Sequence, residues 1–408
     1  MKNPTAQELC ALHARARMIA RDLPPLSLSA GGGLSEESRA CVFRHAQKIL
    51  KRSRAVGASF VLIAPGGFTE VFCHGYARLK PGIPVSPDTC FRIASVSKLV
   101  MSFAALSLAE SGELELDHDI GDYRGYPVRN PHAPVVPITS RMLLTHTAAI
   151  TVDGPYGTLG MQPGCRRRTL LEDASSFRSY APGSAFYYSN LGAGVMGVVL
   201  ERAAGMPFDD ILKQRVFGPL GIRASYDPRR IRPSDDLADG YSVRGILPPT
   251  LRYNAAALSS RPPEPFDPEG DYLIAAGRMI TDSQGMAQLI RLLASQDGMG
   301  VLSADSLHMM RALQDGMPGI VHAGRGLNTA SLPGVFDGFS PVGHQGVAYG
   351  MCAELFADPA SGCGVGVMTS GVRLVRQAPL MRAGFDLLAL GFAVHAQLNA
   401  PTAVTPSP

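Results

Sequence analysis

Apolar residues recur at helix-like spacing between Phe91 and Leu114, in the stretch FRIASVSKLVMSFAALSLAESGEL. They cover more than one face, which predicts a helix that is buried on most sides, and Gly112 predicts its end. A serine, Ser95, stands in the first turn, and Lys98 follows it three residues later. The apolar positions behind this pair are Val96, Leu99, Val100, Phe103, Leu106 and Leu108.

Helix-like and strand-like segments divide the rest of the chain. Alternating or continuous apolar runs predict strands at 58–65, 69–79, 347–358 and 363–371. Helical spacing predicts helices at 4–22, 35–54, 138–150, 191–205, 207–222, 279–296, 303–313 and 373–396. Residues 223–271 are rich in Pro, Arg and Asp and lack periodicity, so they form either a surface excursion, which we favour, or a functional lid.

This order predicts an α+β fold in which the two ends of the chain pair in one antiparallel sheet flanked by helices, with an inserted all-helical lobe. We expect a helical leader and linker at 1–33, a main domain at 34–396 and a disordered tail at 397–408. Within the main domain, 34–95 and 275–396 would form the α/β lobe and 96–274 the helical lobe. Ser95 then lies where the lobes meet, and such clefts often bind ligands.

Composition narrows the classes of function. The chain is 46% hydrophobic and 18% charged, with a net charge of +4, which favours a globular protein without a nucleic-acid or membrane surface. Its seven cysteines are scattered and include no C-x-x-C pair, so we expect neither a disulfide framework nor a metal site. The first residues lack the apolar core of a secretory signal, and no run could span a bilayer, which predicts a cytoplasmic protein.

The spacing of Ser95 and Lys98 is typical of a serine nucleophile with an amine beside it, because positions i and i+3 share a helix face. The alternative is that Ser95 only caps the helix and Lys98 is solvated. The chain has only six lysines, and Lys98 alone has a serine three residues before it; the six are Lys2, Lys48, Lys51, Lys80, Lys98 and Lys213. A buried lysine can lose its proton and act as a base, whereas arginine stays protonated.

Two further motifs carry polar side chains that could meet this pair. Tyr188 and Asn190, in Tyr-Ser-Asn before a predicted helix, could shuttle a proton and bind a substrate carbonyl, although the run could equally be aromatic packing. His344-Gln345-Gly346 precedes a predicted strand, and a backbone N–H after its glycine could donate to an oxyanion. His322-Ala323-Gly324 has the same form, and we prefer 344–346 because a strong strand pair follows it. His146 we interpret as structural.

Together these motifs resemble the serine β-lactamases and penicillin-recognising enzymes, in particular the class C β-lactamase-related branch of esterases, D-aminopeptidases and acyltransferases. FRIASVSKLV is similar to the Ser-x-x-Lys helix of that family, Tyr188-Ser189-Asn190 to its Tyr-x-Asn motif, and His344-Gln345-Gly346 to its Lys/His-x-Gly strand. The similarity extends over about residues 56–390 and leaves out 1–33 and much of 223–271.

The resemblance implies a mechanism without metal or organic cofactor. Ser95 would attack an ester, amide or peptide carbonyl of a small molecule, with Lys98 and Tyr188 sharing the base and proton-shuttle roles. Asn190 would orient Lys98 and the substrate carbonyl. The N–H groups of Ser95 and Val347 would form the oxyanion hole, and water or another acceptor would release the acyl group.

One departure from the family pattern bears on the substrate. The β-lactamases and peptidoglycan peptidases usually carry lysine where His344 stands, and a histidine is mostly neutral near pH 7. This argues for an esterase, amidase or D-aminopeptidase-like serine hydrolase rather than a drug-resistance or cell-wall enzyme. The alternatives are an acyltransferase of a biosynthetic pathway that uses the same acyl-enzyme, and a non-catalytic scaffold or sensor. The sequence leaves the oligomeric state open.

Overall fold

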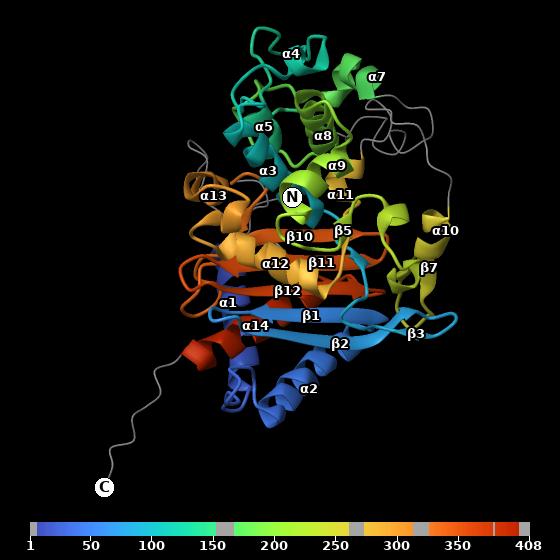
Figure 1. Cartoon of the computed structure of the whole chain (residues 1–408), viewed down its shortest axis with the longest axis vertical. Coiled ribbons are helices and arrows are strands. Elements are labelled where there is room, and N and C mark those ends of the chain that lie inside the picture. Colours follow the sequence, from blue (N-terminus) through green and yellow to red (C-terminus); the bar gives the residue numbers. More distant parts are fainter. Residues whose placement is uncertain (1–5, 152–166, 261–272, 313–325, 378–379, 400–408) are drawn as a thin grey trace.

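The two ends of the chain meet in one antiparallel sheet, as predicted. The computed structural model describes residues 6–151, 167–260, 273–312, 326–377 and 380–399. Its sheet has seven strands in the order β3-β2-β1-β12-β11-β10-β9 (Figure 1). The strands are β1 (Gly57–Ile63), β2 (Thr69–Arg78), β3 (Ile83–Pro84), β9 (Ala330–Ser331), β10 (Val342–Ala348), β11 (Met351–Asp358) and β12 (Cys363–Ser370).

The central pairing joins β1 to β12, strands some three hundred residues apart, with Gly57 opposite Ser370. Side chains along β1 alternate between the two faces of the sheet. Phe60 and Leu62 enter the hydrophobic core on one face, and Val61 and Ile63 enter the core on the other. Both faces of the sheet are therefore buried, which fixes the register of its central strands.

Three helices cover the first face. They are α14 (Arg382–Asn399), α2 (Glu36–Arg52) and α1 (Ala6–Arg21), and α14 packs against β11 and β12. Helix α2 begins where Ser35 accepts a hydrogen bond from the Ser38 N–H. Helix α1 lies on α14, where the Arg15 guanidinium donates two hydrogen bonds of 2.5 Å to the Asp386 carboxylate. The N-terminal helix thus forms part of this core.

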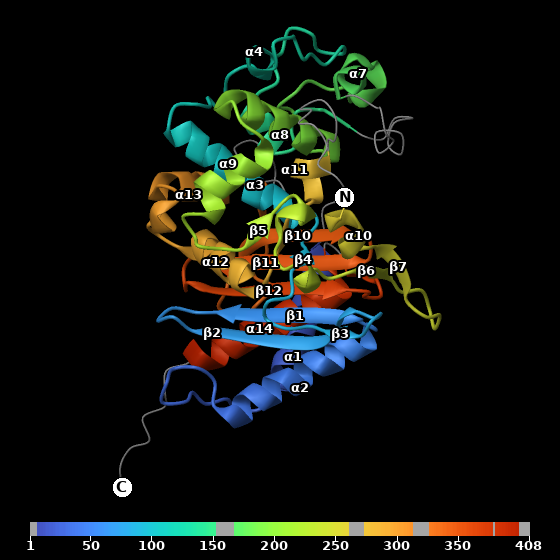
Figure 2. The ribbon, with the colours of Figure 1, turned by 45° about the vertical axis from the view of Figure 1, so that its right-hand side comes forward.

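The second face carries α12 (Ser283–Ala294) and α3 (Val96–Glu110), and α3 leads into a block of helices beyond β10 (Figures 1 and 2). This arrangement confirms the predicted α+β class with an antiparallel sheet flanked by helices. The insertion at 96–274 is not all-helical as predicted, because it includes short strands at 224–225, 240–242 and 250–253. The other helices are α4 (Ile120–Arg124), α5 (Ser140–Leu144), α7 (Arg167–Glu172), α8 (Asn190–Ala204), α9 (Phe208–Leu212), α10 (Ala255–Ser259), α11 (Leu273–Gly277) and α13 (Ala304–Arg311). A π-helical turn, Lys213–Phe217, continues α9.

Short strands connect the two parts. Strands β4 (Phe91–Arg92), β8 (Ile280–Thr281) and β5 (Ala224–Ser225) form a small sheet directly before the Ser95 turn. Two hairpins complete the strands, β6 (Gly240–Ser242) with β7 (Thr250–Tyr253), and β13 (Arg376–Gln377) with β14 (Leu380–Met381). Throughout the ranges given above, the helices are too short or too polar to cross a bilayer.

Several predicted elements have different bounds. The helix expected at 279–296 begins only at Ser283, after strand β8, and the helix expected at 207–222 is α9 followed by the π-helical turn. The strand expected at 347–358 is a hairpin, because Tyr349 and Gly350 both have positive φ and turn β10 into β11. The helix expected at 138–150 ends at Leu144, since His146 and Ala149 also have positive φ. The helix expected at 373–396 runs instead from Arg382 to Asn399, after the β13–β14 hairpin.

Helix α14 extends three residues further than predicted, to Asn399. Residues 397–399, which we assigned to a disordered tail, are the last residues of α14. The Gln397 side chain accepts a hydrogen bond from the Leu26 N–H at 2.9 Å and donates to the carbonyl oxygens of Leu23 and Pro24. These bonds tie the end of α14 to the segment after α1. Residues 400–408 lie outside the described residues.

Candidate active site

Ser95 lies at the start of α3 with its hydroxyl free of any capping role. It occupies the N-cap position with φ −66° and ψ −9°, and its side chain makes no capping hydrogen bond. The preceding residue, Ala94, has φ +47°, an uncommon backbone conformation for a residue other than glycine. Every other residue from Phe91 to Val100 is buried, whereas Ser95 is partly exposed. The interpretation of Ser95 as a simple cap is therefore wrong.

Lys98 is a buried amine beside that hydroxyl. Its side chain is 0% exposed, and Nζ donates to Ser95 Oγ at 3.0 Å and to the Ala276 carbonyl oxygen at 2.5 Å. Burial lowers the pKa of Lys98 to about 7. The interpretation of Lys98 as a solvated side chain is wrong too. This lowered pKa favours the neutral amine, which can accept a proton.

The first turn of α3 is held by bonds that the sequence did not reveal. Ser97 Oγ donates to the Ala94 carbonyl oxygen at 2.5 Å and accepts from the Met279 N–H at 3.1 Å. The buried Tyr226 hydroxyl donates to the Ser97 carbonyl oxygen at 2.6 Å. The Ala276 carbonyl that receives Lys98 comes from α11. Backbone carbonyls carry no sequence signal, so only the fold could identify this last partner.

Tyr188, in the segment before α8, lies beside Ser95 and Lys98. The Ser95 side chain lies near enough to the Tyr188 hydroxyl to oppose part of the rise in its pKa, and the centre of the Tyr188 ring lies 5.0 Å from Lys98 Nζ. The ring remains partly exposed, but desolvation of the phenol raises its pKa above the ordinary value. Tyr188 therefore stays protonated at neutral pH. Asn190, two residues on, is the first residue of α8.

His146 supports the Tyr188 segment. It is buried, and its Nδ1 accepts a hydrogen bond of 3.2 Å from the Ser189 N–H, so the ring proton lies on Nε2. Its ring centre lies 4.5 Å from that of Tyr188. Ser189 in turn caps α8 by accepting from the Gly192 N–H at 2.9 Å. These contacts agree with the structural role predicted for His146.

The predicted glycine motif lies within β10, where Gly346 presses against the turn that carries Ser95. A Cβ on Gly346 would lie 2.2 Å from the Ile93 carbonyl oxygen and 2.7 Å from the Ser95 backbone nitrogen. Only glycine allows the two backbones to approach so closely. Val347 is the next residue of β10, and its predicted contact with an oxyanion stays a prediction. The alternative motif at 322–324 lies outside the described residues.

His344 is a neutral neighbour of this centre. It is 1% exposed, its Nδ1 is 2.6 Å from the Gln345 carbonyl oxygen, and its ring centre is 6.3 Å from that of Tyr188. Burial, together with the nearby Lys98 amine, lowers the pKa of His344 to about 3. At pH 7 the position that is lysine in many members of the resembled family therefore holds no charge.

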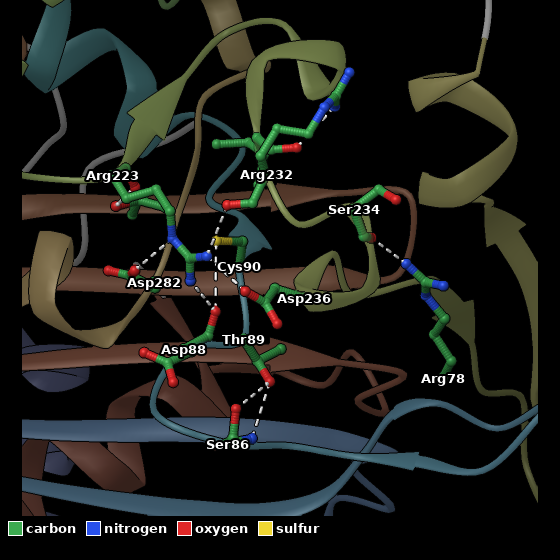
Figure 3. Close-up of polar contacts among 12 residues, drawn as sticks. Arg78, Ser86, Asp88, Thr89, Cys90, Arg223, Arg232, Ser234, Asp236 and Asp282 are labelled. Atoms are coloured by element: carbon green, nitrogen blue, oxygen red, sulfur yellow. Dashed lines mark hydrogen bonds and ion pairs between the residues drawn. The ribbon is translucent and has the colours of Figure 1, made fainter.

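Part of the irregular region 223–271 is hydrogen-bonded to the segment that leads to Ser95 (Figure 3). The Arg223 guanidinium donates to the Asp236 and Asp282 carboxylates at 2.5 and 3.0 Å and to the Asp88 carbonyl oxygen at 2.5 Å. The Cys90 N–H donates to the Asp236 carbonyl oxygen at 2.8 Å. With the Tyr226 bond to α3, this makes residues 223–239 a support for the nucleophile segment rather than the surface excursion that we favoured.

Comparison with known proteins defines the class. The β-lactamase family model matches residues 42–386, which include all the candidate residues described above. The chain belongs to the β-lactamase family, whose relatives here are hydrolases of esters and peptides.

Individual relatives are similar over different lengths. Esterase EstB of Burkholderia gladioli is 30% identical over 69% of this chain and 76% of its own length. The D-alanyl-D-alanine-carboxypeptidase/endopeptidase AmpH of Escherichia coli K12 is 31% identical over 46% of this chain and 49% of its own length. The octameric penicillin-binding protein homologue from Pyrococcus abyssi has a similar fold, with a TM-score of 0.69 and 21% identity over 87% of this chain and 77% of its own.

Proposed function

We propose that this protein is a serine hydrolase that cleaves an ester or amide bond through an acyl-enzyme on Ser95. The observation that carries the proposal is the 3.0 Å contact between the buried Lys98 amine and the partly exposed Ser95 hydroxyl. A nucleophilic serine needs a neighbouring base, and a desolvated amine with a pKa of about 7 is suited to act as one near neutral pH.

We assign the base role to Lys98 and the proton-relay role to Tyr188. Neutral Lys98 takes the Ser95 proton as Oγ attacks the carbonyl carbon, which forms a tetrahedral oxyanion. Tyr188, whose raised pKa keeps it a phenol, gives its proton to the leaving group and regains one from Lys98. The N–H groups of Ser95 and Val347 stabilise the oxyanion, and Asn190 orients the substrate carbonyl. Water then hydrolyses the acyl-enzyme.

This base assignment predicts how the reaction depends on pH. We expect kcat/KM for p-nitrophenyl acetate to rise with pH and to level off above a midpoint near 7, because deprotonation of Lys98 creates the active form. The measurement is a profile of initial rates between pH 5 and 9 at constant ionic strength. A profile that is flat across this range, or one that falls between pH 6 and 8, would contradict a lysine base.

The favoured substrates are esters without a free carboxylate. EstB, the esterase relative, matches over most of this chain, and His344 is neutral where a cation would pair with a carboxylate. A charge-assisted hydrogen bond is worth roughly 1.5–3 kcal/mol, or about tenfold or more in binding.

A pair of esters that differ only in an added carboxylate beside the acyl carbon tests this preference. We expect the neutral ester to have a kcat/KM at least about tenfold higher, because His344 supplies no cation to offset the desolvation of the carboxylate. Equal values, or a preference for the charged ester, would show that another group of the protein recognises the carboxylate.

A further inference from the structure

In the His344-Gln345-Gly346 motif, the Gln345 side chain lies on the other face of the sheet from its two neighbours. Side chains alternate along a strand, so His344 and Gly346 face the Ser95 turn while Gln345 faces away from it. On that far side the Gln345 side-chain amide donates a hydrogen bond to Glu354 Oε1. Glu354 stands directly opposite Gln345 in the β10–β11 ladder.

Glu354 is a fully buried acid with neutral partners. It is 0% exposed, and the same oxygen, Oε1, also receives the Cys352 thiol at 3.8 Å. Among the described residues Oε2 has no hydrogen-bond partner. Burial raises the pKa of Glu354 well above its ordinary value, which agrees with a protonated acid. Two donors at Oε1 identify it as the carbonyl-type oxygen and place the proton on Oε2.

Helix α14 leaves room for the Glu354 side chain. A Cβ on Gly384, in the first turn of α14, would lie 2.0 Å from Glu354 Oε1. The absence of a side chain at that position leaves space for the carboxyl group between the sheet and the helix. Three elements, β10, β11 and α14, therefore meet at this polar pair.

The half of β10 from residue 344 onward is paired with one strand only, β11. Its outer neighbour, β9, pairs only with Val342 and Gly343. From residue 344 onward the β11 ladder lies on one side, and on the other Gly346 abuts the Ile93 carbonyl and the Ser95 backbone nitrogen. A small shift of this strand would change the distance between the Ser95 turn and the backbone N–H groups that follow Gly346.

We propose that Glu354, acting through Gln345, is a positioning residue that holds β10 at the distance from Ser95 that acylation requires. The proposal rests on the proposed function, since it concerns the geometry of the same acylation step. Because neither Gln345 nor Glu354 faces the Ser95 side of the sheet, we expect the pair to affect the rate of acylation rather than the binding of substrate.

The test compares Glu354→Leu with Glu354→Gln. We expect E354L to lower both kcat for p-nitrophenyl acetate and the rate of Ser95 acylation by a fluorophosphonate about tenfold, with KM within about twofold, since small displacements of an oxyanion donor are costly. We expect E354Q to retain near wild-type rates, because its amide oxygen can accept from Gln345 as Oε1 does. Gln345→Met, which removes the donor, should lower the rates as E354L does.

Glu70→Leu is the matched control. Glu70 is a buried carboxyl in the same sheet, on β2, where it accepts from the Leu34 N–H and Arg39 and is far along the strand order from β10. We expect E70L to lower the melting temperature but to leave the acylation rate per folded molecule unchanged. Should E354L fail to fold, Q345M and E354Q decide the question.

The outcomes separate this inference from the proposed function. Acylation of E354L and Q345M at the wild-type rate would overturn the positioning role and leave the Ser95 mechanism intact. A similar loss in E70L, or a loss in E354Q equal to that in E354L, would also overturn it by showing a general structural effect. Failure of the wild-type protein to acquire an adduct on Ser95 would overturn the proposed function itself.

Discussion

Replacing Ser95 with alanine is expected to lower kcat/KM for p-nitrophenyl acetate by at least about 10³-fold and to abolish covalent labelling by fluorophosphonates. The variant lacks the oxygen that Lys98 contacts at 3.0 Å and that lies near the Tyr188 hydroxyl. Stopped-flow or steady-state assays of purified protein measure the loss.

Folding should be almost unaffected by this change. Ser95 makes no capping bond and is partly exposed, and Lys98 keeps its bond to the Ala276 carbonyl. We therefore expect a change in unfolding free energy of no more than about 1 kcal/mol. Ser107→Ala, in the same helix and remote from the site, is the matched control and should keep wild-type activity. Retention of a tenth or more of the activity in S95A would point to another nucleophile.

Replacing Lys98 with methionine is expected to lower kcat/KM by about 10²- to 10⁴-fold, the usual contribution of a positioned general base. Methionine is of similar length and apolar, so it suits a site that is 0% exposed. The Ser95 hydroxyl remains present but loses its proton acceptor. Lys213→Met, at an exposed position, is the control and should be fully active. Wild-type rates in K98M would show that Tyr188 or water serves as the base.

K98M also tests whether burial lowers the pKa of the Lys98 amine, through the pH dependence of the free energy of unfolding. Folding lowers the pKa of Lys98 from about 10.5 to about 7, so between these values the unfolded chain binds a proton that the folded protein does not. Wild-type stability should therefore gain from this residue as pH rises from 7 to 10 and lose as pH falls toward 7. K98M should lack this component and be the more stable protein below pH 7. An identical pH dependence of urea unfolding in both proteins would contradict the lowered pKa.

Local patterns in the sequence predicted much of the architecture because they report burial directly. The dense apolar spacing after Ser95 corresponds to α3, and the apolar runs at 58–65 and 363–371 correspond to β1 and β12, which pair in the centre of the sheet. The serine and lysine spacing likewise brought two side chains together within one helical turn, so their proximity followed from helix geometry alone.

Features that depend on distant contacts escaped prediction. Nothing in Ala348-Tyr349-Gly350 marks a hairpin turn as clearly as Asn-Gly does, so the strand expected at 347–358 joins the last two residues of β10 to β11 and misses the rest of β10. The Tyr226 hydroxyl reaches the site from the segment without periodicity, and the Ala276 carbonyl comes from α11, a helix that the sequence did not predict. The sequence places Gln345 in a motif but does not identify its partner. Glu354 lies opposite Gln345 only when β10 and β11 are paired in register.

The most direct measurement of the central claim is to locate the adduct after brief treatment with a fluorophosphonate. Cleavage after Arg92 and Lys98 by trypsin gives a peptide of residues 93–98 that contains Ser95 and Ser97, and fragmentation of this peptide distinguishes the two. We expect one adduct per molecule, on Ser95, formed faster as the pH rises through about 7. An adduct on Ser97 or on any other residue, or ester hydrolysis that continues at the untreated rate after Ser95 is fully modified, would contradict this mechanism.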